Sequence, residues 1–335
     1  MDKKYKIDEK DKSILYILSQ NCRLNPSTIG KILHLSREVV NYRIKKMIEN
    51  KIILSFTINL KHYELGYKKY SIDLKFQDLA PSEEEKIIKE ITKKIQIFWL
   101  YKTTGDWDWN IELYTKDSND FASKIYSILE IIGNKIKDYN FYKELDYEYF
   151  GYRFLAPTRK MPSNANDKHA FYAEFSKPYK KLERSQRHKD LVNILAVNSR
   201  LNLSSISKIL KTDPKTVKKY IKELIRAKVI TNFVAFIDLN KLNELDYSWY
   251  NVYLRFKNTS VEKIRMLKEY LRGKTEVPWI VTTLGRYNVF FSLILKDQSE
   301  LEHLMNELRE KFKDLIMDYR ITSILKEYYS EGKLP

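Results

Sequence analysis

The sequence predicts an α+β protein of two tandem units, each a winged helix-turn-helix followed by a ferredoxin-like β-α-β-β-α-β domain. Three observations predict this architecture. Residues 23–53 recur at 200–230 without a gap, with 14 identities in 31 positions, which indicates a duplicated domain rather than a solenoid repeat. Each copy of this segment has helical periodicity and helix-capping residues. The residues after each copy follow strand and helix periods in the ferredoxin-like order.

The first copy predicts three helices. Ile14, Ile17 and Leu18 share one face of the first helix, and Ile29 begins the inner face of the second. The third helix follows Ser36, whose hydroxyl suits an N-cap position. In the second copy the equivalent cap is an aspartate followed by proline, which favours the first helical position.

The third helix of each copy combines an apolar face with a basic one. The predicted buried residues are Val40, Ile44 and Met47 in the first copy and Val217, Ile221 and Leu224 in the second. A basic outward face on the last helix is what binding in a DNA major groove requires. The candidate DNA-binding residues are Arg37, Asn41, Tyr42, Lys45 and Lys46 in the first copy, and Lys215, Lys218, Lys219 and Lys222 in the second.

These candidates predict different roles for the two copies. Arg37 and Asn41 are candidates for base contacts, because arginine suits guanine edges and asparagine suits adenine edges. The lysines of the second copy are better suited to phosphates, because an ammonium group is a point charge and lacks the two parallel donors of an arginine guanidinium. Glu38 also falls on the outward face of the first copy.

The formal charge of +17 is concentrated on two segments. Residues 1–60 carry 12 basic and 6 acidic side chains, and residues 176–230 carry 15 and 4, so the rest of the chain is neutral. A generic basic surface would spread its charge, and a membrane-surface helix would expose the apolar bulk that these helices bury. Concentrated cations bind polyphosphate through counterion release. We therefore expect double-stranded DNA as the partner.

After each helix-turn-helix the hydrophobic period changes to two, and then alternates with helical segments. The predicted elements of the first copy are a wing hairpin within Ile52–Leu60, strands at Tyr70–Phe76, Ile97–Thr104, Trp109–Tyr114 and Lys137–Tyr149, and helices at Glu83–Lys94 and Asn119–Ile132. The predicted domains are 1–62, 67–150, 183–241 and 246–330, with a linker at 151–182 that is rich in proline and polar residues. An aromatic cluster in the linker (Phe171, Tyr172, Phe175) predicts that part of it docks onto a domain.

The lead Ile7-Asp8 with Asp11, the helix pair that follows it and the turn Thr104-Gly105-Asp106 together resemble the Lrp/AsnC family of transcriptional regulators. Each of the two copies shows this resemblance, so together they account for nearly the whole chain, with only the linker outside it. It implies DNA binding by the helix-turn-helix. It also implies dimerisation and binding of a small effector, often an amino acid, by the ferredoxin-like module, which is of the RAM type. The effector-binding residues that it implies are Thr104, Gly105, Asp106 and Asp108.

The chain departs from the family pattern in two ways. Family members usually carry one copy per chain, and this chain carries two. Arg286 and Asn288 stand in the second copy where the first has Asp106 and Asp108. An acidic side chain that could hold an effector's ammonium group is therefore missing there.

We expect one chain to form an internal pseudo-dimer. A flexible linker of about 30 residues has a root-mean-square reach of roughly 30 Å, which gives an effective concentration of order millimolar. The alternative is that each copy pairs with its equivalent in a second chain, and assembly into a homo-oligomer stays open in either case.

The sequence thus predicts a cytoplasmic, sequence-specific regulator that is modulated by a metabolite. We expect no enzyme activity or cofactor, because the sequence has no Gly-rich phosphate loop and no GxSxG, HExxH or CxxC motif. Cys22 is the single cysteine, so we expect no multi-cysteine metal site, and no stretch approaches the ~20 apolar residues of a membrane span. One alternative is a siroheme-decarboxylase-like enzyme on the same fold. Those enzymes use histidine and arginine over a tetrapyrrole, and the predicted sheets here carry no histidine. A ligand-binding or scaffolding protein without DNA binding is the other alternative, and it leaves the basic segments unexplained.

Overall fold

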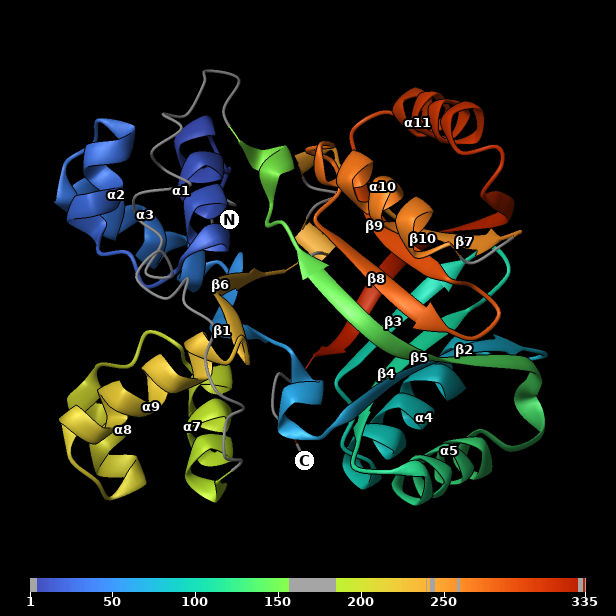
Figure 1. Ribbon diagram of the computed structural model, residues 1–335, viewed down its shortest axis with the longest axis horizontal. Coiled ribbons are helices and arrows are strands. Elements are labelled where there is room, and N and C mark those ends of the chain that lie inside the picture. Colours follow the sequence, from blue (N-terminus) through green and yellow to red (C-terminus); the bar gives the residue numbers. More distant parts are fainter. Residues whose placement is uncertain are drawn as a thin grey trace. The chain divides into compact units, whose positions relative to one another are not determined.

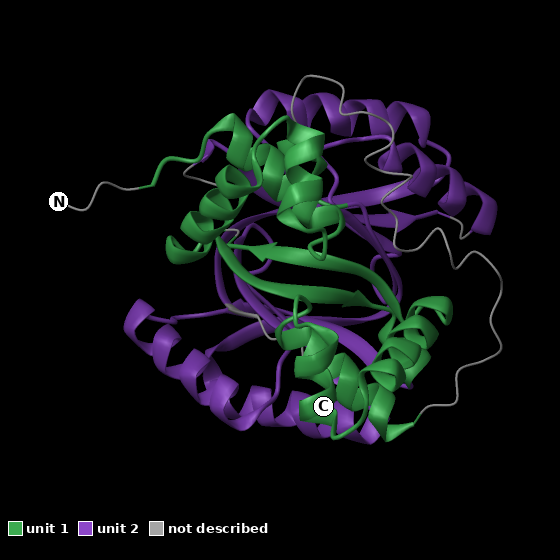
Figure 2. Cartoon of the chain, turned by 90° about the vertical axis from the view of Figure 1, so that its left-hand side faces the viewer, with its two compact units in different colours: residues 1–65, 151–241, 332–334 green, residues 66–150, 242–331, 335 purple. Residues whose placement is uncertain are grey.

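The computed structural model describes residues 5–156, 185–238, 240–241, 245–257, 260–330 and 334. The chain forms two compact units (Figures 1 and 2). The first unit combines 1–65 with 151–241 and 332–334, and so holds both helix-turn-helix copies. The second combines 66–150 with 242–331 and 335, and holds both ferredoxin-like copies.

Each helix-turn-helix contains the three predicted helices. They are α1 (Glu9–Gln20), α2 (Pro26–Leu33) and α3 (Arg37–Glu49) in the first copy, and α7 (Gln186–Val197), α8 (Leu203–Leu210) and α9 (Pro214–Arg226) in the second. The predicted caps of the third helices are confirmed. Ser36 Oγ accepts a hydrogen bond from the Val39 amide at 3.2 Å, and Asp213 Oδ1 accepts one from the Thr216 amide at 2.9 Å. These bonds satisfy amides that the helix itself leaves free.

The strand after each helix-turn-helix pairs with its counterpart from the other copy. β1 (Ile53–Leu60) runs antiparallel to β6 (Ile230–Ile237) in a two-stranded sheet. Figure 2 shows these strands side by side, with one cluster of helices above them and one below. The prediction of a wing hairpin within 52–60 is wrong. The segment is a single strand, and the other copy supplies the partner for its backbone groups.

Equivalent side-chain contacts cross between the copies beside this sheet. The Arg23 guanidinium lies over the Phe233 ring at 5.2 Å, and the Arg200 guanidinium lies over the Phe56 ring at 4.8 Å. Arg23 also donates to the Ser199 carbonyl at 2.7 Å. The two helix-turn-helix copies are therefore joined by backbone pairing and by cation–π contacts.

The second unit is built from two ferredoxin-like modules in the predicted element order. The first contains β2 (Lys68–Phe76), α4 (Pro81–Lys94), β3 (Trp99–Thr104), β4 (Trp109–Thr115), α5 (Ser118–Ile132) and β5 (Ile136–Tyr149). The second contains β7 (Ser248–Phe256), α10 (Val261–Arg272), β8 (Trp279–Leu284), β9 (Val289–Leu295), α11 (Gln298–Lys311) and β10 (Ile316–Ser330). Because β5 pairs with β8 and β10 pairs with β3, the two sheets close into one barrel.

The helices cover the outside of this barrel. α4 and α5 pack on the strands of the first module, and α10 and α11 on those of the second (Figure 1). Each helix layer encloses its own apolar core, in which Trp109 and Ile128 are fully buried in the first module and Phe291 and Leu308 in the second. The faces of the strands that point away from the helices line the interior of the barrel.

The beginning of the predicted linker, 151–182, is ordered against the first unit. The amide of Tyr152 donates to Ser19 Oγ of α1 at 3.0 Å, and a short 3-10 helix, η3 (Arg153–Leu155), follows. The rest of the linker, including Phe171, Tyr172 and Phe175, lies outside the described residues.

Candidate DNA-binding and effector sites

The outward face of α3 presents the predicted residues of the first copy to solvent. Its inner face is buried as predicted, with Val40 and Met47 fully inaccessible. Arg37, Asn41 and Lys45 are exposed, and 60% of Tyr42 is accessible. Lys46 is half-buried and forms an ion pair with Glu49 at 2.9 Å, so part of its charge is already balanced.

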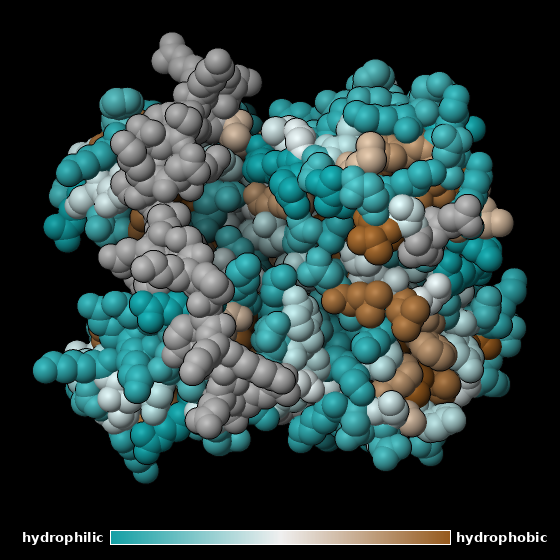
Figure 3. Space-filling model, in the orientation of Figure 1, coloured by the Kyte–Doolittle hydropathy of each residue, from teal (hydrophilic) through white to brown (hydrophobic). Residues whose placement is uncertain are grey.

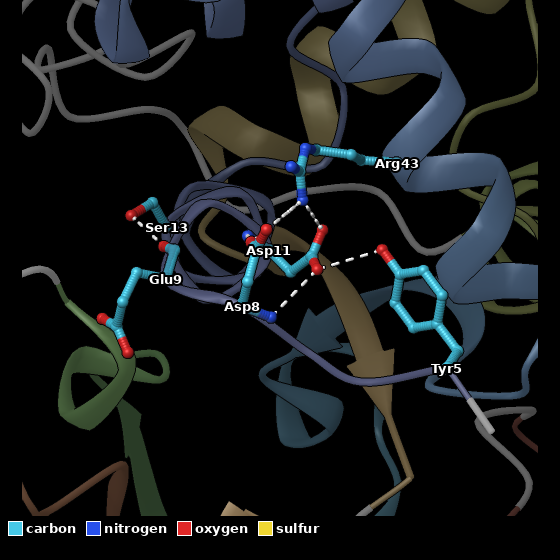
Figure 4. Close-up of polar contacts among 6 residues, drawn as sticks. All are labelled: Tyr5, Asp8, Glu9, Asp11, Ser13 and Arg43. Atoms are coloured by element: carbon cyan, nitrogen blue, oxygen red, sulfur yellow. Dashed lines mark hydrogen bonds and ion pairs between the residues drawn. The ribbon is translucent and has the colours of Figure 1, made fainter. Parts of the chain in front are cut away.

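Two carboxylates at the start of α1 hold α3 in place through an arginine on the side of α3 (Figure 4). Arg43 Nη1 lies 2.8 Å from Asp8 and 2.9 Å from Asp11, and Tyr5 donates to Asp11 at 3.0 Å. Asp8 and Asp11 also form the capping box of α1. Although partial burial raises the pKa of Asp8, hydrogen bonds from the Asp11 amide and Arg43 lower it below its usual value. Arg43 therefore holds α3 against the start of α1, and its charge is balanced by the two carboxylates.

The outward face of α9 is more basic than that of α3. Lys215, Lys218 and Lys219 are exposed and Lys222 is half-buried. An open hollow of about 520 Å³ runs along this face, lined by Lys215, Lys218, Lys219, Lys222, Glu223 and Arg226. The surface over α8 and α9 is mostly hydrophilic (Figure 3). α9 has five cations and one acid, whereas α3 has four cations and two acids.

The contact that fixes α9 has diverged from the one that fixes α3. His188 of α7 is buried, and its Nε2 lies 3.1 Å from Glu223 of α9. Its Nδ1 lies 2.7 Å from the hydroxyl of Ser185, the N-cap of α7. Ser185 and His188 occupy the positions of Asp8 and Asp11 in the first copy. A histidine–glutamate pair thus replaces an arginine–carboxylate cluster.

The predicted effector residues lie together at the turn between β3 and β4. Thr104 is exposed, and Gly105 adopts a φ of 112°, which favours glycine. Asp106 is exposed and pairs with Arg320 Nε of β10 at 2.8 Å. Asp108 pairs with the Lys75 ammonium at 2.9 Å and accepts from the Phe76 amide at 2.8 Å. Both carboxylates therefore already have cationic partners.

The equivalent turn of the second copy lacks this charge pattern. Asn288 keeps the structural role of its counterpart, since its Oδ1 accepts from the Phe256 amide at 2.8 Å. Arg286 is exposed and stacks over Tyr287 at 5.7 Å. A Cβ atom on Gly285 would lie 2.7 Å from Tyr142 Cβ, so glycine is required by close packing.

Comparisons with known proteins identify both helix-turn-helix copies. Residues 7–48 match the AsnC-type helix-turn-helix domain, and residues 184–231 match a winged helix-turn-helix DNA-binding domain. The HTH-type transcriptional regulator LrpA of Pyrococcus abyssi is 32% identical over 130 residues, which cover 39% of this chain and 86% of LrpA. The HTH-type transcriptional regulator Ptr1 of Methanocaldococcus jannaschii is 30% identical over 134 residues, covering 39% of this chain and 89% of Ptr1.

The chain belongs to the Lrp/AsnC family of transcriptional regulators. Its duplicated arrangement also has a parallel among solved structures. The match to the crystal structure of the siroheme decarboxylase NirDL covers 97% of this chain and 94% of the NirDL chain. Its TM-score is 0.59 and its sequence identity is 15%. At that identity the likeness is one of fold. No helix among the described residues of this Lrp/AsnC chain is long and apolar enough to cross a membrane.

Sequence reasoning missed a polar network inside the barrel of this Lrp/AsnC protein. Asp73 of β2 is 1% exposed and accepts hydrogen bonds from Asn110 Nδ2 at 2.7 Å and Asn140 Nδ2 at 3.2 Å. Asn110 Nδ2 also lies 3.2 Å from the Tyr142 hydroxyl. Burial raises the pKa of Asp73 to about 7, although the two amides act in the opposite direction. The alternating pattern of β2 was the available signal, but it does not show that a second sheet covers the polar face.

A buried ion cluster lies on the same interior face. Lys69 is 7% exposed, and its ammonium lies 2.7 Å from Glu112 and 3.1 Å from Glu144. Burial alone would lower the pKa of Lys69, but the two carboxylates raise it above its usual value. The equivalent residues of the second copy are Trp249, Ser292 and Ile324, so the two halves of the barrel interior differ in charge.

Proposed function

We propose that the protein regulates transcription by inserting α3 and α9 into two major grooves of one DNA duplex. The observation that carries this proposal is the pairing of β1 with β6, which joins two helix-turn-helix domains of a regulator family, each with its third helix exposed. Paired domains of this kind bind half-sites one helical turn, or a multiple of it, apart. The two exposed faces coincide with the segments that hold the excess positive charge.

The two recognition helices have different roles in this proposal. In α3, Arg37 and Asn41 contact base edges, while Tyr42, Lys45 and Lys46 support them. In α9, the lysine side chains along the hollow contact phosphates. α3 then supplies more of the sequence preference, and α9 more of the salt dependence.

Removing charge from α9 tests this function. In the variant Lys218→Gln/Lys219→Gln/Lys222→Gln, binding should weaken on every sequence, and the slope of log affinity against log salt should flatten by ~0.9 for each lost phosphate contact. Fluorescence anisotropy with duplex DNA at several salt concentrations measures both quantities. The matched control replaces three exposed lysines of α4, Lys86, Lys89 and Lys93, with glutamine. Equal slopes for wild type and the α9 variant, with the fold intact, would reject the assignment.

We also propose that an amino acid binds at the turn between β3 and β4. Asp106 and Arg320 are both partly exposed and lie 2.8 Å apart. A zwitterion offers a carboxylate to the arginine and an ammonium to the aspartate, so it can replace one ion pair with two. Thr104 and Gly105 border this pair, and Asp108 lies beyond it, next to β4. The turn of the second copy has Arg286 in place of the acid, so we propose one effector site per chain.

The internal pseudo-dimer is the unit that we propose for DNA binding. β1 of the first copy pairs with β6 of the second within the same chain. The edge strands of the two ferredoxin-like modules also pair with each other within the chain. Assembly of such chains into a homo-oligomer is compatible with this unit. We propose no enzyme activity, because the likeness to a siroheme decarboxylase is one of fold and the four described histidines all lie outside the strands.

A further inference from the structure

An acidic residue, Glu38, lies on the recognition face of α3. It is exposed, and it forms no hydrogen bond or ion pair with the described part of the chain. A carboxylate on this face repels phosphate, so it lowers the affinity for DNA in general. An acidic residue at this position therefore works against general affinity for DNA.

The second copy supplies an internal comparison for this position. Residues at i, i+3, i+4 and i+7 share one face of a helix. On that face α3 carries Glu38, Asn41, Tyr42 and Lys45, and α9 carries Lys215, Lys218, Lys219 and Lys222 at the equivalent positions. Lysine is thus compatible with the fold at this site.

Helix stability gives Glu38 only a small role. An acidic residue in the first turn interacts favourably with the helix dipole, typically by ~0.3–1 kcal/mol. In α9 the acidic N-cap, Asp213, can supply the same interaction, whereas the N-cap of α3, Ser36, is neutral, and the two helices are equally long at 13 residues. Ser36 and Asp213 already provide the N-caps of the two helices.

We propose, on the basis of the proposed function, that Glu38 is a specificity-determining residue of α3. Its carboxylate accepts a hydrogen bond from the amino group of a cytosine in the major groove, a pairing that suits glutamate geometrically. Where no amino group is present, the same carboxylate stays unpaired and disfavours binding. Glu38 thus reduces binding to other sequences, whereas the lysine face of α9 attracts any DNA.

Selection from randomised duplexes by the full-length protein tests this role. Wild type should enrich cytosine at one position of the half-site bound by α3, by about tenfold or more over the other bases. Glu38→Gln should lose this preference or shift it to adenine, because a glutamine amide suits adenine edges. Glu38→Lys should lose it too, bind non-specific DNA more tightly, and steepen the salt slope by ~0.9.

Lys215→Gln is the matched control, since it changes the equivalent position of α9. It should weaken binding to all sequences alike and leave the selected bases unchanged. If both Glu38 variants select the same bases as wild type and differ only in overall affinity, Glu38 acts as a bulk charge and the inference is overturned. Failure of the proposed function has a different signature, because wild type would then enrich no sequence at all.

Discussion

Replacing Asp73 with asparagine should change how the stability of the protein depends on pH. Asp73 is fully buried in the barrel, and burial raises its pKa from 3.8 to about 7. The folded state therefore keeps the proton over a pH range in which the unfolded chain releases it. The contribution of Asp73 to the free energy of unfolding is fully present below pH 3.8 and is lost as the pH rises through about 7.

The size of the effect follows from the two pKa values. One pKa unit corresponds to ~1.36 kcal/mol. Between about pH 5 and about pH 8, a group that titrates near 7 when folded and near 3.8 when unfolded should lower the free energy of unfolding by ~2.5 kcal/mol. The asparagine side chain in Asp73→Asn cannot ionise, so the variant should lack this decrease and be the more stable protein at about pH 8.

Urea unfolding at a series of pH values between about 5 and 8 measures the effect. At about pH 5 the variant should be slightly the less stable, because an amide has one acceptor oxygen for the two amides of Asn110 and Asn140. Asp78→Asn, at an exposed position with a φ of 53° that asparagine tolerates, is the control. Equal pH slopes for wild type and Asp73→Asn would refute the buried-acid interpretation.

Two further predictions concern the effector and the linker. Amino acids that raise the melting temperature of wild type should lose that effect in Asp106→Ala but keep it in Asp78→Ala, and a hit that Asp106→Ala leaves unchanged would place the effector site elsewhere. Cutting the chain at a protease site inserted near Asn164 should leave two fragments that elute together and bind the same DNA, because strand pairs in both units join the copies. Separate homodimers of each fragment would contradict the internal pseudo-dimer.

Most helices and strands could be predicted from local sequence because local chemistry sets their ends. The helix expected at Asn119–Ile132 begins one residue earlier, at Ser118, since Asp117 accepts from the Asp120 amide at 2.9 Å and acts as the N-cap. The exposure of Arg37 and Asn41 follows from the helical period in the same way. Features of this kind depend on residues a few positions apart.

Two features that sequence reasoning missed depend on contacts between the copies. A β-branched segment such as Ile53–Leu60 suits a hairpin or a single strand equally well, and its partner begins at Ile230. The pairing of Asp106 with Arg320 likewise joins the two copies. Neither periodicity nor capping carries information about such contacts.

The same contacts explain how the copies could diverge without separating. β1 pairs with β6, β5 with β8 and β3 with β10 through backbone groups, which do not depend on side-chain identity. In a dimer of identical chains, any change in a recognition helix appears in both half-sites. In this chain Glu38 and Lys215 can differ, because each belongs to its own copy. The duplication therefore supports the proposed DNA site with two unlike halves, in which we propose that α3 selects the sequence and α9 adds affinity through phosphates.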